Sequence, residues 1–280
     1  MSKPPPVPLP SEPGRQEPAA APAAGDARRE LIGHTAVVTG SSSGIGRAIA
    51  LALAAAGANV LVHARQSTAA AAAVASQAAA LGGDSLVKLA DLADSVQRRR
   101  FIEDAFAWHG RVDIWVNNAG ADVLTGEAAQ WSFEQKLAAL WRLDVEATVQ
   151  LSREAGARLR RQGRGVILNI GWDQAEQGMS GDSGELFAAT KGAVMAFTRS
   201  LAQSLAPQVR VNCVAPGWIR TAWGQHASDD WQRRAADECL LARWGTPEDV
   251  AQVACFLASP AAAFINGQIV PVNGGWRRAR

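Results

Sequence analysis

The stretch Thr39-Gly40-Ser41-Ser42-Ser43-Gly44-Ile45-Gly46 decides the fold of this chain. It directly follows the apolar run 36–38 and directly precedes an alanine- and leucine-rich run over 48–56. A strand, a glycine turn and a helix start in this order hold a dinucleotide pyrophosphate on backbone N–H groups at the helix N-terminus. The stretch therefore predicts a dinucleotide-binding unit at the beginning of the folded domain.

From Leu31 onward, short β-branched runs alternate with longer helical stretches. All-apolar strands such as 166–168 fit a parallel sheet that is covered on both faces. Alternating strands and helices predict an α/β fold, a Rossmann-like doubly wound parallel sheet of about seven strands, in a single domain over 31–280. We expect strands near 35–39, 59–63, 85–89, 112–116, 165–170, 209–214 and 268–272. We expect helices near 44–56, 68–81, 94–109, 133–162, 187–206, 229–241 and 247–258.

The first thirty residues have a different composition. Most of the thirteen prolines lie between Pro4 and Pro22, among Ala, Glu, Gly and Arg. Such a segment cannot bury enough apolar surface to order itself, so residues 1–30 are predicted to be a disordered or polyproline-like extension. It lacks the apolar core of a secretory signal.

Composition excludes several classes of function. The net charge is +2, and charges of both signs are scattered along the chain, which gives no electrostatic case for nucleic-acid or membrane binding. No apolar run approaches the length of a membrane span. Cys213, Cys239 and Cys255 lack metal-ligand spacing and are expected to be buried thiols in a reducing, cytoplasmic compartment. No metal site is predicted.

Four further motifs follow the glycine turn. They are Asn117-Asn118-Ala119-Gly120, Pro216-Gly217-Trp218-Ile219-Arg220-Thr221, Arg243-Trp244-Gly245-Thr246-Pro247-Glu248-Asp249-Val250, and Asn266-Gly267-Gln268 with Asn273-Gly274-Gly275. Five spaced motifs in this order make chance agreement implausible. The chain resembles the short-chain dehydrogenase/reductase superfamily, in its 3-oxoacyl-acyl-carrier-protein-reductase-like branch, over almost the whole globular part.

Cofactor preference depends on the end of the second predicted strand. Ala64 stands where NAD-specific members of the family hold the ribose diol with a carboxylate, and Arg65 follows it. A guanidinium can pair with the 2′-phosphate of NADP, whereas a carboxylate would repel it. The sequence therefore favours NADP(H) over NAD(H). The alternative is that Arg65 stacks on the adenine or faces solvent, which would leave selectivity weak.

The resemblance also assigns the other residues that would bind the cofactor. Asp91 would contact the adenine amino group, and Lys191 would bridge the hydroxyls of the nicotinamide ribose. The remaining candidates are Gly40, Ser42, Ser43, Gly44, Ile45, Gly46, Leu92, Asn118, Ala119, Gly120, Pro216, Gly217, Ile219 and Thr221.

The catalytic pattern departs from the family. Members use a serine and a tyrosine on the substrate oxygen, a lysine that lowers the pKa of the tyrosine, and an asparagine that holds a relay water. This chain contains no tyrosine. Lys191 matches the lysine, and Phe187, one helical turn before it, stands at the tyrosine position. Trp172 stands at the serine position, and Asp144, or Glu146 if the alignment slips, at the asparagine position.

These replacements exclude the ordinary mechanism. Phenylalanine can neither give nor take a proton, and an indole only donates. Lys191 and Asp144 remain as candidate catalytic residues. A replacement acid could come from the loop that follows Trp172, among Asp173, Glu176, Asp182 and Glu185, or from His226; a solvated loop face is the simpler interpretation for most of these carboxylates.

The remaining aromatic residues and histidines have plainer interpretations. Trp218 and Trp223 are expected to crowd the substrate side together with Trp172 and Phe187. Core or helix packing is expected for Trp115, Trp141 and Trp244. His34, His63 and His109 are expected at the edge of the core or at helix ends.

Three functions fit this pattern. The first is an NADP(H)-dependent oxidoreductase that acts on a carbonyl or alcohol. The second is a dinucleotide-loaded pseudoenzyme that acts as a sensor or scaffold. The third is a non-redox isomerase or lyase that uses Asp144 and Lys191 as acid and base. A small-molecule substrate is expected, and the helices near 133–162 and 187–206, with apolar runs 193–197 and 201–205, predict a homo-oligomer, either a tetramer or a dimer.

Overall fold

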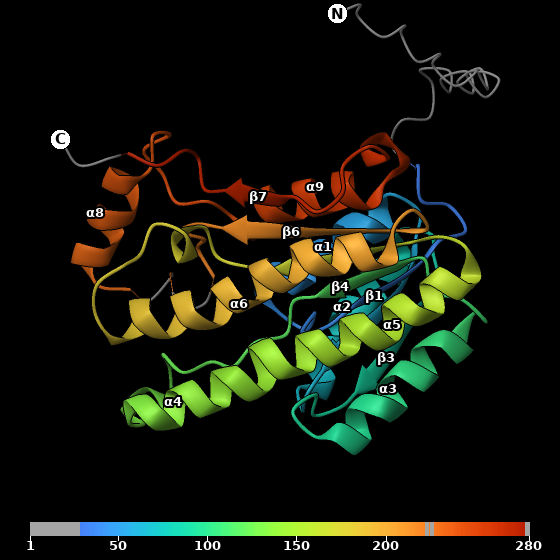
Figure 1. The fold of residues 1–280 in the computed structure, drawn as a ribbon, viewed down its shortest axis with the longest axis horizontal. Coiled ribbons are helices and arrows are strands. Elements are labelled where there is room, and N and C mark those ends of the chain that lie inside the picture. Colours follow the sequence, from blue (N-terminus) through green and yellow to red (C-terminus); the bar gives the residue numbers. More distant parts are fainter. Residues whose placement is uncertain (1–28, 222–223, 225–226, 278–280) are drawn as a thin grey trace, which may run out of the picture.

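The computed structural model describes residues 29–221, 224 and 227–277. Its centre is one sheet of seven parallel strands in the order β3-β2-β1-β4-β5-β6-β7 (Figure 1). The strands are β1 (Thr35–Val38), β2 (Asn59–Ala64), β3 (Ser85–Leu89), β4 (Ile114–Asn117), β5 (Gly165–Ile170), β6 (Val209–Pro216) and β7 (Ile269–Val272). This sheet confirms the predicted single-domain α/β fold. Residues 1–28 of the predicted extension lie outside the described residues.

Helices cover both faces of the sheet. On one face lie α1 (Gly44–Ala55), α2 (Thr68–Ala80) and α9 (Pro247–Ala258), which share a core with β1, β2 and β4. On the other face lie α3 (Ser95–Trp108), α5 (Thr148–Gln162) and α6 (Asp182–Leu205). Figure 1 shows α5 and α6 running side by side across the front of the sheet. The two layers explain why the strands are apolar on both faces.

Strand order reverses between β1 and β4. The chain moves outward from β1 to β3, returns to place β4 on the other side of β1, and then continues to β7. In an open parallel sheet, ligands bind at the carboxyl ends of the strands on either side of this switch point. The topology therefore places the glycine turn after β1 and the Asn117-Asn118-Ala119-Gly120 motif after β4 at one crevice.

The predicted helix over 133–162 is interrupted. It consists of α4 (Phe133–Leu140), a π-helical segment over Trp141–Ala147, and α5. Insertions of this kind widen a helix by one residue locally and are frequent at functional sites. The segment carries Asp144. The 3.6-residue periodicity of the sequence does not by itself reveal the π-helical insertion.

Two other helix boundaries differ from the prediction. Helix α6 begins at Asp182 rather than near 187, so Asp182 and Glu185 lie in its first turn and not in a loop. Negative side chains are stabilised at that end of a helix by its dipole. Helix α8 (Asp229–Glu238) ends three residues early, because the backbone of Leu240 pairs with Gly275 instead, at 3.0 Å.

A buried polar network supports the sheet beneath the crevice. Asn117 on β4 donates to Asn169 Oδ1 on β5 and to Ser152 Oγ on α5, both at 2.8 Å. Asn169 in turn donates to Thr198 Oγ1 on α6 at 2.9 Å, and Trp115 Nε1 donates to Asn117 Oδ1 at 2.8 Å. All of these groups are buried, and each amide is satisfied within the network. The network therefore fixes β4 and β5 relative to the two helices that flank the site.

Within the described part of the chain, no helix has the length and apolar character that a membrane crossing requires. The described residues also contain no cluster of three or more His, Cys, Asp and Glu side chains suited to a metal ion.

Candidate active site

The glycine turn packs too tightly for side chains. An ideal Cβ on Gly46 would lie 2.3 Å from the carbonyl oxygen of Gly40, and one on Gly40 would lie 2.8 Å from the Cα of Ala119. Gly40 and Gly44 also have positive φ angles of 63° and 54°. Only glycine meets these conditions without strain.

The N-terminus of α1 is open to an anion. Its N-cap residue Ser43 makes no side-chain capping hydrogen bond. The first-turn N–H groups, which include those of Gly44, Ile45 and Gly46, have no acceptor within the helix. Ser42 and Ser43 are partly or fully exposed beside them. Across from this end lies Thr221, whose Cγ2 would be 3.8 Å from a Cβ on Gly44.

The turn is tied to the end of β4. Thr39 Oγ1 accepts from the backbone N–H groups of Asn118 and Ala119 at 2.9 and 3.0 Å. The Asn118 side chain donates to the carbonyls of Thr39 and Gly40 at 3.0 and 3.1 Å. The two motifs predicted to bind the cofactor therefore form one rigid unit.

His63 holds the turn from the side of β2. Its Nδ1 accepts from the backbone N–H of Gly40 at 2.9 Å, and its Nε2 lies 3.0 Å from the carbonyl of Ala90. Because Nδ1 accepts, the neutral ring carries its proton on Nε2 and donates it to Ala90. Burial lowers the pKa of His63 to about 4. Sequence reasoning placed this histidine at the core edge and missed its role in the turn.

The residues predicted for the adenine side follow β2 and β3. Arg65 is exposed directly after β2, and no hydrogen bond or ion pair joins it to a described residue. The Asp91 carboxylate accepts from the N–H of Ala93 at 2.9 Å, and Leu92 is buried. The loop that carries Asp91 and Leu92 is thus ordered by its own backbone contacts.

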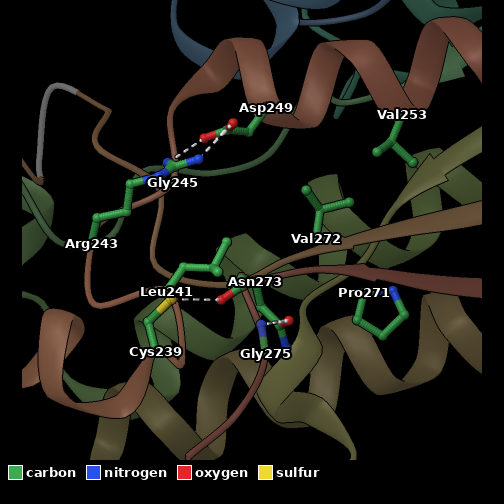
Figure 2. A pocket seen from close by; sticks show the side chains of 11 residues that line it. Cys239, Leu241, Arg243, Gly245, Asp249, Val253, Pro271, Val272, Asn273 and Gly275 are labelled. Atoms are coloured by element: carbon green, nitrogen blue, oxygen red, sulfur yellow. Dashed lines mark hydrogen bonds and ion pairs between the residues drawn. The ribbon is translucent and has the colours of Figure 1, made fainter.

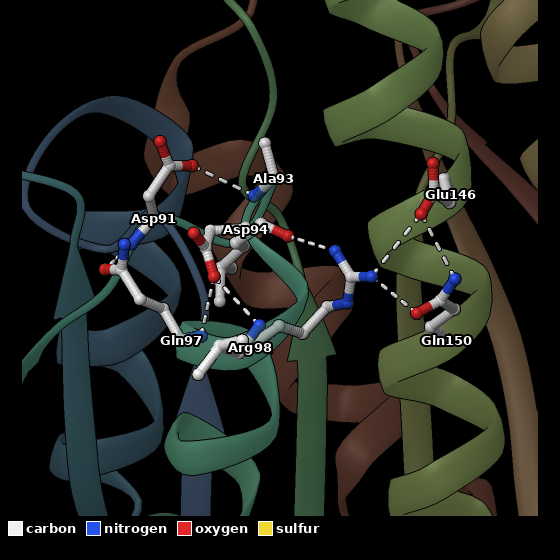
Figure 3. A network of polar contacts seen from close by, with 9 residues as sticks. Asp91, Ala93, Asp94, Gln97, Arg98, Glu146 and Gln150 are labelled. Atoms are coloured by element: carbon white, nitrogen blue, oxygen red, sulfur yellow. Dashed lines mark hydrogen bonds and ion pairs between the residues drawn. The ribbon is translucent and has the colours of Figure 1, made fainter.

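A buried arginine connects this loop to the π-helical segment (Figure 3). Arg98 on α3 donates to the carbonyl of Leu92 and to Gln150 Oε1, both at 2.5 Å, and lies 3.4 Å from Glu146 Oε1. Sequence reasoning did not identify this contact. Glu146 therefore pairs with Arg98, whereas Asp144 contacts Lys191.

Asp144 and Lys191 form a buried ion pair at the floor of the crevice. Their Oδ2 and Nζ atoms are 2.8 Å apart, and the side chains are only 2% and 14% exposed. Asp144 Oδ1 also accepts from the backbone N–H of Ala121 at 2.8 Å. A Cβ on Gly120 would lie 2.9 Å from Asp144 Oδ2, so a side chain at this position would displace the carboxylate.

Two aromatic rings lie together where the sequence predicts the serine and tyrosine positions. The rings of Trp172 and Phe187 meet edge to face, with centroids 6.2 Å apart. Phe187 packs against a small apolar cluster of Val123, Leu140 and Leu186. Neither ring offers a hydrogen-bond acceptor to a ligand.

The segment after β6 carries the last predicted residues. Pro216 ends β6, Gly217 N–H donates to the carbonyl of Val272 at 3.0 Å, and Ile219 is buried and bridges to Gly245. Trp218 does not join Trp172. It packs instead on Trp231 and Trp244 and donates from Nε1 to Glu238 Oε2 at 2.8 Å. Trp223 and His226 lie outside the described residues.

The other tryptophans and the cysteines divide by environment. Trp115 and Trp244 are buried, as predicted, but Trp141, the first residue of the π-helical segment, is 49% exposed. Cys213 and Cys239 are buried and Cys255 is half-buried. Burial raises the pKa of the Cys213 thiol to about 12, which makes it an unreactive core residue.

A cavity of about 340 Å³ lies beside β7, the last strand of the sheet (Figure 2). Its lining includes Arg243 and Asp249, which form an ion pair at 2.7 Å, and also Asn273 and Cys239. None of the predicted catalytic residues lines this cavity.

Comparisons with known proteins agree on one family. The sequence model described as enoyl-(acyl carrier protein) reductase matches residues 40–277. Tropinone reductase-like 3 from Erythroxylum coca is 34% identical over 251 residues, which cover 88% of this chain and 94% of that protein. The 3-oxoacyl-(acyl-carrier-protein) reductase FabG of Staphylococcus aureus is 35% identical over 243 residues, which cover 86% and 97%.

Solved structures give the same result. A 7α-hydroxysteroid dehydrogenase complexed with NADH and 7-oxo glycochenodeoxycholic acid has a TM-score of 0.81 and 30% identity, over 89% of this chain and 96% of that one. A short chain dehydrogenase from Burkholderia cenocepacia in complex with NADP has a TM-score of 0.78 and 33% identity, over 88% and 98%. The names of these relatives describe oxidoreductases, and each match covers nearly the whole length of the relative.

Proposed function

The chain belongs to the short-chain dehydrogenase/reductase superfamily, and on that premise we propose that it is an NADP(H)-dependent oxidoreductase that interconverts a carbonyl and an alcohol. The observation that carries this proposal is the glycine turn. Gly46 has no room for a Cβ, and the N-terminus of α1 is uncapped. A dinucleotide pyrophosphate fits such a cradle, because the backbone approaches closely and free N–H groups face the anion.

We expect the dinucleotide to be held by the same residues that the sequence analysis indicates. The first turn of α1 and Thr221 would bind the phosphates, the Asp91–Leu92 loop would bind the adenine, and Lys191 would bind the nicotinamide ribose. When bound, the cofactor supplies or accepts the hydride. The relatives of known structure carry NADP or NADH.

The preference for NADP(H) is supported by Arg65. Its guanidinium is exposed at the end of β2, with no carboxylate of a described residue beside it. Ala64, buried in the strand, offers nothing that would repel a 2′-phosphate. A free guanidinium at this point is suited to a bidentate phosphate contact.

We infer that Trp172 and Phe187 replace the family's serine and tyrosine. The inference is supported by Phe187 lying one helical turn before Lys191 on α6 and by its ring contact with Trp172. Lys191, held by Asp144, keeps an ammonium donor at the floor of the site. Its charge is already matched by a carboxylate, which sets this site apart from one in which lysine acts on a tyrosine.

The aromatic pair also favours one alternative, a dinucleotide-loaded binding protein without turnover. Two rings in contact fill volume that a substrate carbonyl would otherwise enter. The two functions differ in a simple measurement, since both bind NADPH and only one oxidises it in the presence of a carbonyl.

The test measures NADPH and NADH affinity and their oxidation with a panel of ketones and aldehydes. We expect tighter binding of NADPH, reversal or loss of that preference in Arg65→Asp, and turnover of at least one carbonyl. Gly46→Ala should abolish binding, whereas Gly192→Ala, at a helical glycine with open space around its Cβ position, should not. Binding of NADPH without any turnover would support the binding protein instead.

We further propose that the protein is a homo-oligomer. The apolar runs 193–197 and 201–205 support this less than expected, because Val194, Met195, Leu201 and Leu205 are buried within the chain itself. Support comes instead from α4 and the π-helical segment, where Trp141 is exposed beside a groove lined by Phe133 and Leu137. Exposed apolar patches of this kind are typical of interfaces.

A further inference from the structure

The segment between β5 and α6, together with the first turn of α6, carries four carboxylates in different environments. Glu176 is exposed and pairs with Arg199 at 2.7 Å. Asp182 and Glu185 are exposed in the first turn of α6. Asp173 differs from all three: it is half-buried and begins a 3₁₀ turn (Asp173–Ala175) directly after Trp172. The structure therefore separates one carboxylate from three solvated ones.

Asp173 lies where three strands end together. It follows β5, and its Oδ2 accepts from Asn273 Nδ2, just after β7, at 2.9 Å. A Cβ on Gly217, just after β6, would lie 3.1 Å from the same oxygen. Gly217 belongs to the segment that would bind the cofactor. The carboxyl group thus sits at the edge of the sheet that holds the site.

The direction of its one side-chain hydrogen bond is fixed. Asn273 Oδ1 accepts from the backbone N–H of Gly275 at 2.9 Å, so the amide must present its NH₂ group to Asp173. Asp173 Oδ2 is consequently an acceptor in this contact. If the carboxyl group is protonated, the proton resides on Oδ1.

Asp173 Oδ1 is buried and has no hydrogen-bond partner among the described residues. Gln174, the next residue of the turn, is 1% exposed, and its Nε2 also has no partner there. Buried polar atoms are normally satisfied, so an unpaired acceptor and an unpaired donor on consecutive residues point to a bound polar ligand.

The burial of Asp173 favours its protonated form. Burial raises the pKa of Asp173 to about 6, although the hydrogen bond from Asn273 and the backbone N–H groups of Gln174 and Asp173 lower it; Glu238 on α8 adds a smaller rise. Glu238 is itself paired with Arg234 at 2.7 Å and accepts from Trp218, so no cation is left to stabilise an Asp173 carboxylate from that side. A carboxyl group that titrates near neutral pH is suited to general acid–base work.

We propose that Asp173, through Oδ1, exchanges the proton with the substrate oxygen in place of the missing tyrosine. The proposal rests on the proposed oxidoreductase function. In reduction, the carbonyl carbon would receive the hydride that a bound reduced nicotinamide supplies, the π electrons would move to oxygen, and that oxygen would take the proton from Oδ1. The products are the alcohol, the oxidised dinucleotide and the Asp173 carboxylate, which regains a proton from water. Oxidation reverses each step.

The test compares Asp173→Asn with Glu176→Gln, a matched change of an exposed carboxylate in the same segment. We expect Asp173→Asn to lower carbonyl reduction about 10²–10⁴-fold with the NADPH dissociation constant unchanged. Glu176→Gln should change neither, and Asp173→Glu should recover part of the rate. Reduction by the parent should fall as pH rises through about 6, and alcohol oxidation should rise over the same range.

A second readout needs neither substrate nor cofactor. Infrared difference spectra of the parent against Asp173→Asn should contain a protonated carboxyl band that disappears as pH rises through about 6. No such band, or equal reduction rates in Asp173→Asn and the parent, would overturn the assignment while the oxidoreductase function stood. A parent that reduces no carbonyl would overturn the function first, before any variant is compared.

Discussion

The ion pair of Asp144 and Lys191 gives a prediction about stability whose size follows from its geometry. The charged atoms are 2.8 Å apart and the carboxylate is almost completely buried. At an effective dielectric constant of about 20, unit charges at that distance attract by about 6 kcal/mol. Desolvation of both groups offsets most of this energy, so the pair contributes little net stability while it is intact.

Removing one partner has a much larger effect. Lys191→Met leaves a buried carboxylate with the N–H of Ala121 as its remaining partner among the described residues. We expect it to lower the free energy of unfolding by about 3–5 kcal/mol. Asp144→Asn keeps an acceptor for that N–H and leaves a flexible ammonium with some solvent access, so its effect should be smaller. The double variant has no charge at either position and should be more stable than Lys191→Met alone.

The assay is urea denaturation of the four proteins at one protein concentration, with the m-value as a check that the unfolded states are alike. Arg199→Met, which breaks the exposed pair with Glu176, is the control and should cost less than about 1 kcal/mol. A Lys191→Met protein within about 1 kcal/mol of the parent would refute the reasoning. A double variant no more stable than Lys191→Met would refute it equally.

Three further predictions concern the same crevice, and a fourth concerns the oligomer. Asp144 already neutralises the charge of the buried lysine, so removing that carboxylate should help a reintroduced tyrosine. The triple variant Asp144→Asn/Trp172→Ser/Phe187→Tyr should therefore reduce ketones at least about tenfold faster than the double variant Trp172→Ser/Phe187→Tyr, measured as steady-state NADPH oxidation. Equal rates would contradict this. His63→Leu leaves the Gly40 N–H unpaired and should weaken NADPH binding in fluorescence titrations by about 1–3 kcal/mol, roughly 5–150-fold, whereas His63→Asn keeps an acceptor and should lose much less. Burial lowers the pKa of His63 to about 4, so between pH 6.5 and 4 only the unfolded chain binds a proton at this residue. The free energy of unfolding of the parent should therefore fall as pH drops through that range, and this contribution should be absent in His63→Leu. Light scattering at micromolar concentration should give a multiple of the chain mass, and a monomer would rule out the proposed oligomer.

Sequence periodicity predicted the sheet well because parallel strands buried on both faces are continuous apolar runs. The boundaries of β3 and β5 agree with the structure to the residue. The π-helical segment over 141–147 was not predictable, since one inserted residue leaves the apolar pattern of its flanking helices intact. Trp141, for which core or helix packing was expected, is exposed at the start of this segment.

The candidate site was predicted in part. Glycine spacing identified the turn because the backbone geometry itself requires glycine. The counting that placed Asp144 beside Lys191 is matched by their ion pair. The partners of His63 and Arg98 were missed, because the contacts of His63 with Gly40 and of Arg98 with Gln150 join residues far apart in sequence, and neither side chain belongs to a motif. Asp173 could be separated from its neighbours only once burial was known.

The amide network of Asn117 and Asn169 has a consequence for how this site could diverge. Its hydrogen bonds join the two amides to each other and to Ser152, Thr198 and Trp115. None of them involves the side chains at 172 or 187. Substitutions at those two positions therefore leave this network intact. A lineage can lose the hydroxyl groups of its reaction at one mutational step each, retain a stable dinucleotide-binding domain throughout, and acquire new chemistry from a neighbouring residue afterwards.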